Sequence, residues 1–156
     1  MFTKFTERIR AMDYDSIYND TVKETSYELG VLIRNQILSG EDKDGNPLGT
    51  YQGDDTERGS FGLEYVKKKI DLGLFPINTL PYYNLFYSGN FLNSITPIVN
   101  SSGDIDVIST DSKLAAIEEN VEDMSSALTP SEENLNEYIA LIKPIIQNKL
   151  RGSLGI

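Results

Sequence analysis

Apolar side chains recur at helical spacing through residues 16–39, and a stripe of this length has to be buried along a core. The apolar positions of this stripe are Ile17, Val22, Leu29, Leu32, Ile33 and Ile37. Asp13 or Asp15 can accept hydrogen bonds from the free amides at the start, and Gly40 can end the helix in a left-handed conformation. The segment therefore predicts a long amphipathic helix.

A second long helix is predicted near the end of the chain. Thr129-Pro130-Ser131-Glu132 has the order of an N-cap, a first-turn proline and the reciprocal glutamate of a capping box. The apolar face of this helix is formed by Leu135, Tyr138, Ile139, Leu141, Ile142, Ile145, Ile146 and Leu150. Pro144 is expected to kink the helix because its ring displaces the backbone bond to residue 140, and Gly152 is expected to end it.

Between the two helices the sequence predicts a β-hairpin. Thr96–Asn100 and Asp104–Thr110 are rich in Ile and Val, and Ser101-Ser102-Gly103 joins them. Pro97 indicates that the first strand begins late or lies at a sheet edge, because proline cannot donate to the ladder. One helical turn is expected just before the hairpin, at Asn90–Ile95.

The remaining segments carry weaker patterns. We expect a short helix over Phe61–Leu72, an extended path through Leu74–Tyr87 and partial helix in Lys113–Leu128. Residues 40–62 are polar and rich in turn residues, and they predict a long loop or arm. The fold class is therefore α+β, with a long N-terminal helix and a C-terminal helix packed on a small antiparallel sheet that contains a hairpin near 96–110.

Composition bounds the domain number and excludes several chemistries. The chain has 156 residues, 39% of them hydrophobic and 24% charged, which fits a single domain over 1–156 with a modest core. There is no His, Cys or Trp, so Cys–His and Ser–His–Asp catalysis, the usual zinc sites and disulfides are excluded. No residue pattern calls for a cofactor. The net charge of −10 lacks the basic footprint of a nucleic-acid binder, although an acidic surface can line a passage through which DNA slides.

No membrane or secretory segment is expected. The first ten residues lack the apolar core of a signal peptide, and no stretch approaches the roughly 20 apolar residues of a membrane span. The most apolar zone, Leu72–Tyr87, is interrupted by Gly, Pro and Asn. We therefore expect a soluble protein that is cytoplasmic when made.

Two carboxylate patterns raise the question of a metal site. A calcium loop with Gly45 at its sixth position would begin at Gly40 and end at Tyr51, and neither residue supplies the needed carboxylate. A sharp turn explains that segment better. Asp104 and Asp106 fall on one face of a strand and could hold Mg²⁺ in a nuclease-like site. No rigid strand supplies the acidic-x-Lys partner of such a site, so a solvated hairpin is the favoured interpretation.

Two motifs in a fixed order point to a family. Residues 40–51 match Gly-x-Asp-x-x-Gly-Asn-x-Ile/Leu-Gly-x-Tyr, and residues 85–91 match Leu-x-Leu/Tyr-Thr/Ser-Gly-x-Phe. A helix start at Thr129-Pro130-Ser131-Glu132 follows, with Lys143-Pro144 further on. Over residues 30–150 this order resembles small tailed-phage proteins of the virion-morphogenesis or tail-completion family (neck, head–tail joining), in the form seen in phages of Bacteroides-type hosts.

The resemblance implies a structural virion protein rather than an enzyme. Such proteins form homo-oligomeric rings between the portal, the neck and the tail tube, with no cofactor, no membrane and no sequence-specific binding of nucleic acid. DNA passes through the ring, and repeated acidic subunits would keep its lumen slippery. The expected location is the virion neck or tail, reached from the host bacterial cytoplasm during assembly.

Subunit contacts are expected in the 40–62 loop and in the aromatic 82–91 segment, whose side chains offer apolar area at a low ordering cost. The candidate contact residues are Asp44, Gly45, Asn46, Pro47, Leu48, Gly49, Tyr51, Tyr82, Tyr83, Phe86, Tyr87 and Phe91. The last four are equally compatible with a place in the core.

Three other functions remain open from the sequence. The chain could be another portal-attached or capsid-associated phage protein, such as a capsid-decorating one. It could be a small Mg²⁺-dependent nuclease or hydrolase that uses Asp104 and Asp106. It could also be an acidic protein that mimics DNA and blocks a host defence, which requires the charge to gather on one face.

Overall fold

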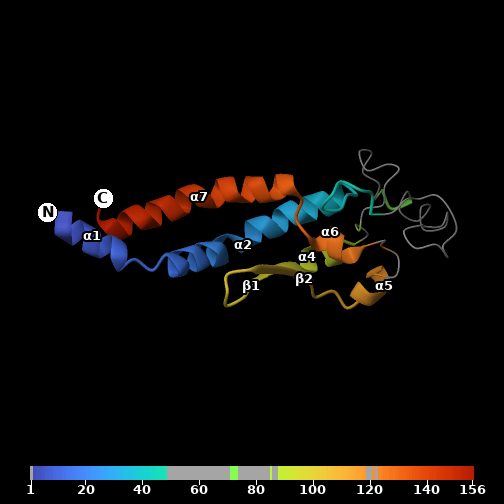
Figure 1. Ribbon diagram of the computed structural model, residues 1–156. Coiled ribbons are helices and arrows are strands. Elements are labelled where there is room, and N and C mark those ends of the chain that lie inside the picture. The colour runs from blue at the N-terminus through green and yellow to red at the C-terminus, as the bar shows by residue number, and fades with distance from the viewer. Residues whose placement is uncertain (1, 49–70, 74–84, 86–87, 119–120, 122) are drawn as a thin grey trace.

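The computed structural model describes residues 2–48, 71–73, 85, 88–118, 121 and 123–156 (Figure 1). Its elements are, in chain order, α1 (Phe2–Arg10), α2 (Tyr14–Leu38), α4 (Asn90–Ser94), β1 (Ile95–Val99), β2 (Ile105–Ser109), α5 (Leu114–Glu118), α6 (Met124–Leu128) and α7 (Glu132–Leu154). Helices pack on a small two-stranded antiparallel sheet, which confirms the predicted α+β class with its hairpin.

Helix α2 is the central element of the fold. Helix α7 runs beside it along one side, and the β1–β2 hairpin lies on the other (Figure 1). The predicted long helix over 16–39 is confirmed, and Asp13 caps it by accepting from the amide of Ser16 at 2.9 Å. At the end of the helix, Gly40 takes the left-handed φ of 80° expected of a stop residue.

The core lies between α2, the hairpin, α6 and the start of α7. Its buried residues are Leu29, Ile33, Ile37, Leu48, Leu85, Phe91, Leu92, Ile95, Val121, Met124, Ala127, Tyr138 and Ile142. Helix α7 buries less of its predicted apolar face than expected, because it packs mainly along a single neighbour, α2. Leu135, Ile139 and Leu141 stay exposed.

The hairpin pairs Pro97 with Val107, and β1 already begins at Ile95. A late start of the first strand is therefore wrong, whereas the alternative of an edge strand is confirmed, since both strands of a two-stranded sheet are edges. Pro97 also meets α2 closely. A Cβ placed on Gly30 would lie 3.1 Å from Cδ of Pro97, so Gly30 lets the strand approach the helix.

Two details of the last helix differ from the prediction. The N-cap is Ser131, whose side chain accepts from the amide of Asn134, whereas Thr129 is the C-cap of α6. Thr129 ends α6, so α7 starts two residues later than predicted, at the N-cap Ser131. Gly152 does not end α7, because it lies inside the helix, which continues to Leu154. Gly155 ends it with a φ of 73°.

In two regions the helices differ from the sequence-based prediction. Helix α1 was not predicted, and Arg8 ties it to the end of α7 by donating to the carbonyl of Leu154 at 2.9 Å. The partial helix expected in 113–128 is two short helices, α5 and α6. The expectations for 61–72 and 74–87 lie largely outside the described residues. In the described part of the chain, no helix combines the length and apolarity needed to cross a bilayer.

Candidate functional site

The candidate site is the turn of residues 40–48, which follows α2 and forms the described part of the predicted loop. The amide of Leu48 donates to the carbonyl of Gly40 at 2.9 Å, so the turn closes on itself. Inside it, the amide of Asp42 donates to the carbonyl of Asn46 at 2.8 Å. Gly45 has a φ of 76°, which an L side chain rarely adopts. The predicted sharp reversal is confirmed.

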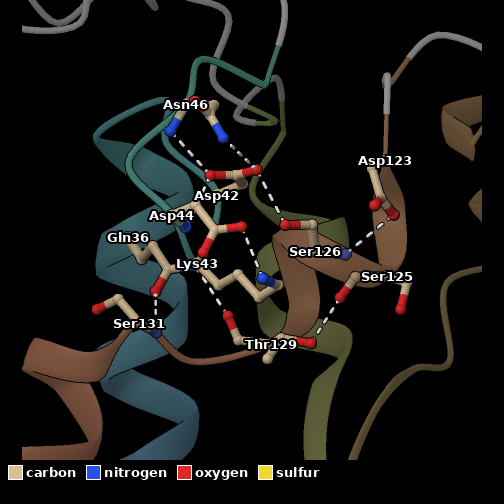
Figure 2. Close-up of polar contacts among 10 residues, drawn as sticks. All are labelled: Gln36, Asp42, Lys43, Asp44, Asn46, Asp123, Ser125, Ser126, Thr129 and Ser131. Carbon is tan, nitrogen blue, oxygen red and sulfur yellow. Dashed lines mark hydrogen bonds and ion pairs between the residues drawn. The ribbon is translucent and has the colours of Figure 1, made fainter.

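The carboxylate of Asp42 organises this turn from within (Figure 2). Oδ1 accepts from the amides of Asp44 and Asn46 at 2.9 and 2.8 Å, and Oδ2 accepts from the hydroxyl of Ser126 at 2.9 Å. Partial burial raises the pKa of Asp42, but the hydrogen bonds from Asn46, Ser126 and Asp44 outweigh burial and hold the pKa below its ordinary value. With hydrogen-bond donors on both oxygens, the carboxylate stabilises the turn from inside and links it to Ser126.

Helix α6 anchors the turn to the body of the protein. The amide of Lys43 donates to the carbonyl of Ser126 at 3.2 Å, next to the Asp42–Ser126 side-chain bond. Asp123 caps α6 by accepting from the amide of Ser126 at 3.0 Å, which fixes the place of that serine (Figure 2). The turn is thus held by both backbone and side-chain bonds to a second element.

Gln36, on the last turns of α2, fixes the other wall of the site. Its side chain is buried, and Nε2 donates to the carbonyl of Thr129 at 3.0 Å. Oε1 accepts from the amide of Ser131 at 2.9 Å and from Nδ2 of Asn134 at 2.8 Å. One amide side chain therefore joins α2 to the α6–α7 junction with its donor and acceptor both used.

A groove runs between the turn and the start of α7. Its lining residues are Asn35, Gln36, Ser39, Glu41, Asp42, Lys43, Asp44, Gly45, Pro130, Ser131, Glu132, Glu133 and Asn134. Carboxylates outnumber the one lysine of this lining, and Lys43 is itself bonded to Asp44 at 2.6 Å in an exposed ion pair. The groove is therefore an acidic, polar surface suited to contact with a basic or polar partner surface.

The structure divides the predicted contact residues into two groups. Asp44, Gly45 and Asn46 are exposed at the tip of the turn, and Pro47 is half-buried. Leu48 and Phe91 are 2% and 5% exposed and belong to the core, so in this fold they are not available to a neighbour. The burial of Phe91 agrees with the alternative prediction that this residue belongs to the core. The other candidates, Gly49, Tyr51, Tyr82, Tyr83, Phe86 and Tyr87, lie outside the described residues.

Among the described residues, no further acidic side chains join Asp104 and Asp106, the possible magnesium pair, in a larger cluster. Asp106 is exposed in β2, whereas Asp104 precedes the strand and accepts from the hydroxyl of Ser102 at 2.7 Å. Asp111 accepts from the amide of Lys113 at 2.7 Å and so shapes a turn. Over the described ranges, no group of three or more acidic residues is placed to hold a metal ion.

Sequence reasoning missed the residues that position the site, above all Gln36 and Ser126. The signal for Gln36 was its place four residues after Leu32 on the apolar stripe of α2, where a polar side chain needs buried partners. The signal for Ser126 was its spacing of three from Asp123, which is typical of a helix cap and its bonded amide.

Comparison with known proteins gives no relative: no family model matches the chain, and no curated protein or solved structure is significantly similar to it.

Proposed function

We propose that this chain is a structural subunit of a tailed-phage virion, part of the neck, the head–tail connector or a tail-completion ring, and that it acts by packing against its neighbours. The proposal starts from the order of two motifs, in residues 40–51 and 85–91, which resembles that of the virion-morphogenesis family. The location that follows is the mature particle, with assembly in the host bacterial cytoplasm.

The observation that supports the proposal is that the described part of the first motif is an internally hydrogen-bonded turn with an exposed tip. Asp42 is the internal acceptor of the turn, and Gly45 supplies the positive φ. Asp44 and Asn46 stay exposed. A loop whose shape is fixed before binding loses less conformational entropy when a neighbour docks, which suits a repeated subunit contact.

The second motif supports the same proposal through the fold. Gly89 takes a φ of 79° and precedes α4 as its N-cap, and Leu85 and Phe91 are buried in the same core cluster as Leu48 of the first motif. The motif residues thus divide between holding the domain together and presenting a polar tip, which is the division that a building block needs.

Quantitative mass spectrometry of purified virions tests the proposal. We expect several copies of the chain per particle, in a constant ratio to the portal. Asp44→Lys should lower the yield of infectious particles while the isolated protein keeps its fold, because the exposed tip changes charge. Asp106→Lys, an equal charge change on the exposed hairpin, is the matched control. Absence of the chain from mature virions, or Mg²⁺-dependent cleavage of nucleic acid by the pure chain that Asp106→Ala abolishes, would overturn the proposal.

A further inference from the structure

The two strands of the hairpin have different outer edges, and the hydrogen bonds at its ends show which backbone groups point outward. The amide of Asn100 donates to the carbonyl of Asp104 at 3.0 Å. The amide of Thr110 donates to the carbonyl of Ser94 at 3.3 Å. Because opposite residues of an antiparallel pair alternate between bonded and non-bonded, the bonded pairs fall on even-numbered residues. The odd-numbered residues of both strands therefore direct their amides and carbonyls away from the partner strand.

The outer edge of β1 is closed. The amide of Ile95 donates to the carbonyl of Leu92 at the end of α4, and the carbonyl of Ile95 accepts from Nη2 of Arg34 at 2.9 Å. Pro97 has no amide proton to donate, and its ring lies so close to α2 that a Cβ added to Gly30 would be 3.1 Å from it. A further strand therefore has no continuous row of donors and acceptors to pair with along β1.

The outer edge of β2 is open in the part of the chain that the structure describes. Its outward residues are Ile105, Val107 and Ser109, and none of their amides and carbonyls bonds another described residue. All three residues are partly exposed, and the hairpin lies against α2 mainly through β1 (Figure 1). At a rise of about 3.4 Å per residue the edge is about 17 Å long, which is an ordinary strand length. Unpaired backbone groups of this kind are a template for an added strand.

The side chains of β2 indicate what an added strand should carry. Ile105 and Val107 are partly buried and pack against the core. Apolar, β-branched side chains placed beside them would extend that apolar face. Asp106 lies on the other face of the strand and is exposed. A basic side chain directly opposite Asp106 would form a favourable cross-strand pair.

The charge around the edge distinguishes between possible occupants. Residues 95–112 include Asp104, Asp106 and Asp111 and contain no Lys or Arg. A second copy of β2 would bring the same carboxylates into one sheet, whereas a basic segment is attracted to them. Antiparallel pairing is favoured, because its hydrogen bonds are slightly more stable per residue than those of a parallel pair.

From the open edge and its charge we infer that β2 binds an extended segment of another protein, which adds to the sheet as an antiparallel strand and alternates apolar with basic residues. The backbone bonds supply most of the binding, and the cross-strand charge pair adds a smaller amount. This edge does not include the 40–48 turn, so the inference and the proposed function can fail independently.

Amide hydrogen exchange, followed by NMR on the full chain, tests whether the edge is open. The amides of Ile105, Val107 and Ser109 should exchange at least about tenfold faster than those of Asp106 and Ile108, which bond β1. Edge amides that are already protected in the free chain would overturn the inference, because another segment or a second copy would then occupy the edge.

A short capped peptide, acetyl-Thr-Val-Lys-Val-Lys-Val-Thr-amide, is the probe for strand addition. Paired antiparallel with its central valine opposite Val107, it places a lysine opposite Asp106. It should bind with a dissociation constant of roughly 100 µM and slow the exchange of the three edge amides. N-methylation of the central valine removes the amide that donates to Val107 and should weaken binding at least about tenfold. N-methylation of the preceding lysine, whose amide points away from β2, is the matched control and should leave binding unchanged.

Changes on the protein and in the peptide charge complete the test. Val107→Pro removes the central amide of the edge and should weaken peptide binding at least about tenfold, whereas Val107→Ile keeps that amide and should bind like the native chain. Circular dichroism checks that both variants keep their fold. A peptide with Glu in place of both lysines should bind about fivefold more weakly at low salt. No binding below about 2 mM, equal binding of the two N-methylated peptides, or equal binding of the glutamate peptide would overturn the inference.

Discussion

The backbone amide of Ser131 donates to Oε1 of Gln36 at 2.9 Å, so a buried side chain on α2 receives the N-cap residue of α7. The same side chain donates to the carbonyl of Thr129 at 3.0 Å. Residues almost a hundred positions apart are thereby joined where the acidic groove begins. The start of α7 is fixed by this contact as well as by its own cap.

Gln36→Leu should therefore destabilise the protein. Leucine has a similar volume but leaves the amide of Ser131 and the carbonyl of Thr129 without their partner, and a buried unpaired polar group costs about 1–3 kcal/mol. We expect the free energy of unfolding in urea to fall by about 3 kcal/mol. Asn35→Ala, at the exposed neighbouring position, should change it by about 0.5 kcal/mol or less. An unchanged urea midpoint for Gln36→Leu would show that the network adds no stability.

Asp42 should make stability depend on pH in the acid range. Its pKa is lower in the folded state than the ordinary 3.8, so the stability it contributes is present above pH 3.8 and is lost as pH falls through the folded value. Asp42→Asn should cost about 1–2 kcal/mol at neutral pH, since a charged acceptor bonds its donors more strongly.

The difference in the free energy of unfolding between the native chain and Asp42→Asn should shrink when urea unfolding is repeated at lower pH. Asp44→Asn is the matched control, because the side chain of Asp44 forms an exposed ion pair with Lys43 and the substitution keeps the backbone amide that bonds Asp42. A gap between native chain and Asp42→Asn that stays constant down to the acid limit would contradict the assigned role of the Asp42 carboxylate.

The hydroxyls of Thr25 and Tyr138 lie 2.9 Å apart between α2 and α7, and a double-mutant cycle can measure this contact. Thr25→Val and Tyr138→Phe should show a coupling of about 1 kcal/mol in the free energy of unfolding. Additive effects of the two substitutions would mean that the hydroxyl pair contributes nothing of its own.

Burial raises the pKa of Tyr138 above the ordinary 10.0, although the bond to Thr25 lowers it in part. The phenol is therefore protonated more readily in the folded state, and the stability linked to it is lost as pH rises above 10.0. In an ultraviolet titration, the tyrosinate signal that the native chain has and Tyr138→Phe lacks should develop above pH 10.0. A difference signal centred at pH 10.0 would contradict the burial of the Tyr138 hydroxyl.

Two glycine substitutions should have opposite effects on stability. Gly103 has a φ of 87°, and a Cβ there would lie 2.2 Å from Oδ1 of Asn19, so Gly103→Ala should destabilise the protein by about 1–3 kcal/mol. Gly152 is helical with open space around its Cα, so Gly152→Ala should be neutral or stabilising by up to about 1 kcal/mol. Thermal unfolding of both variants gives the comparison, and equal shifts would contradict the tight packing of the hairpin turn on α2.

The elements with strong local signals were predictable from sequence. The stripe of α2, the Ile- and Val-rich strands around Ser101-Ser102-Gly103 and the Asp44-Gly45 turn each specify their structure within a few residues. The cap of α7 was misplaced from Ser131 to Thr129, because both hydroxyls fit a helix start and only the end of α6 distinguishes them.

Local sequence patterns are therefore enough to predict the secondary structure with clear periodicity, the acidic charge and the absence of His and Cys chemistry. Which polar groups meet depends on the packing of whole elements: Gln36 bonds Ser131, Asp42 bonds Ser126, and Thr25 bonds Tyr138. The same packing also decides which apolar residues stay open, such as Ile139 on α7. The reason is physical: periodicity depends on neighbours within one helical turn or strand, whereas hydrogen bonds and burial between distant residues depend on how whole elements pack.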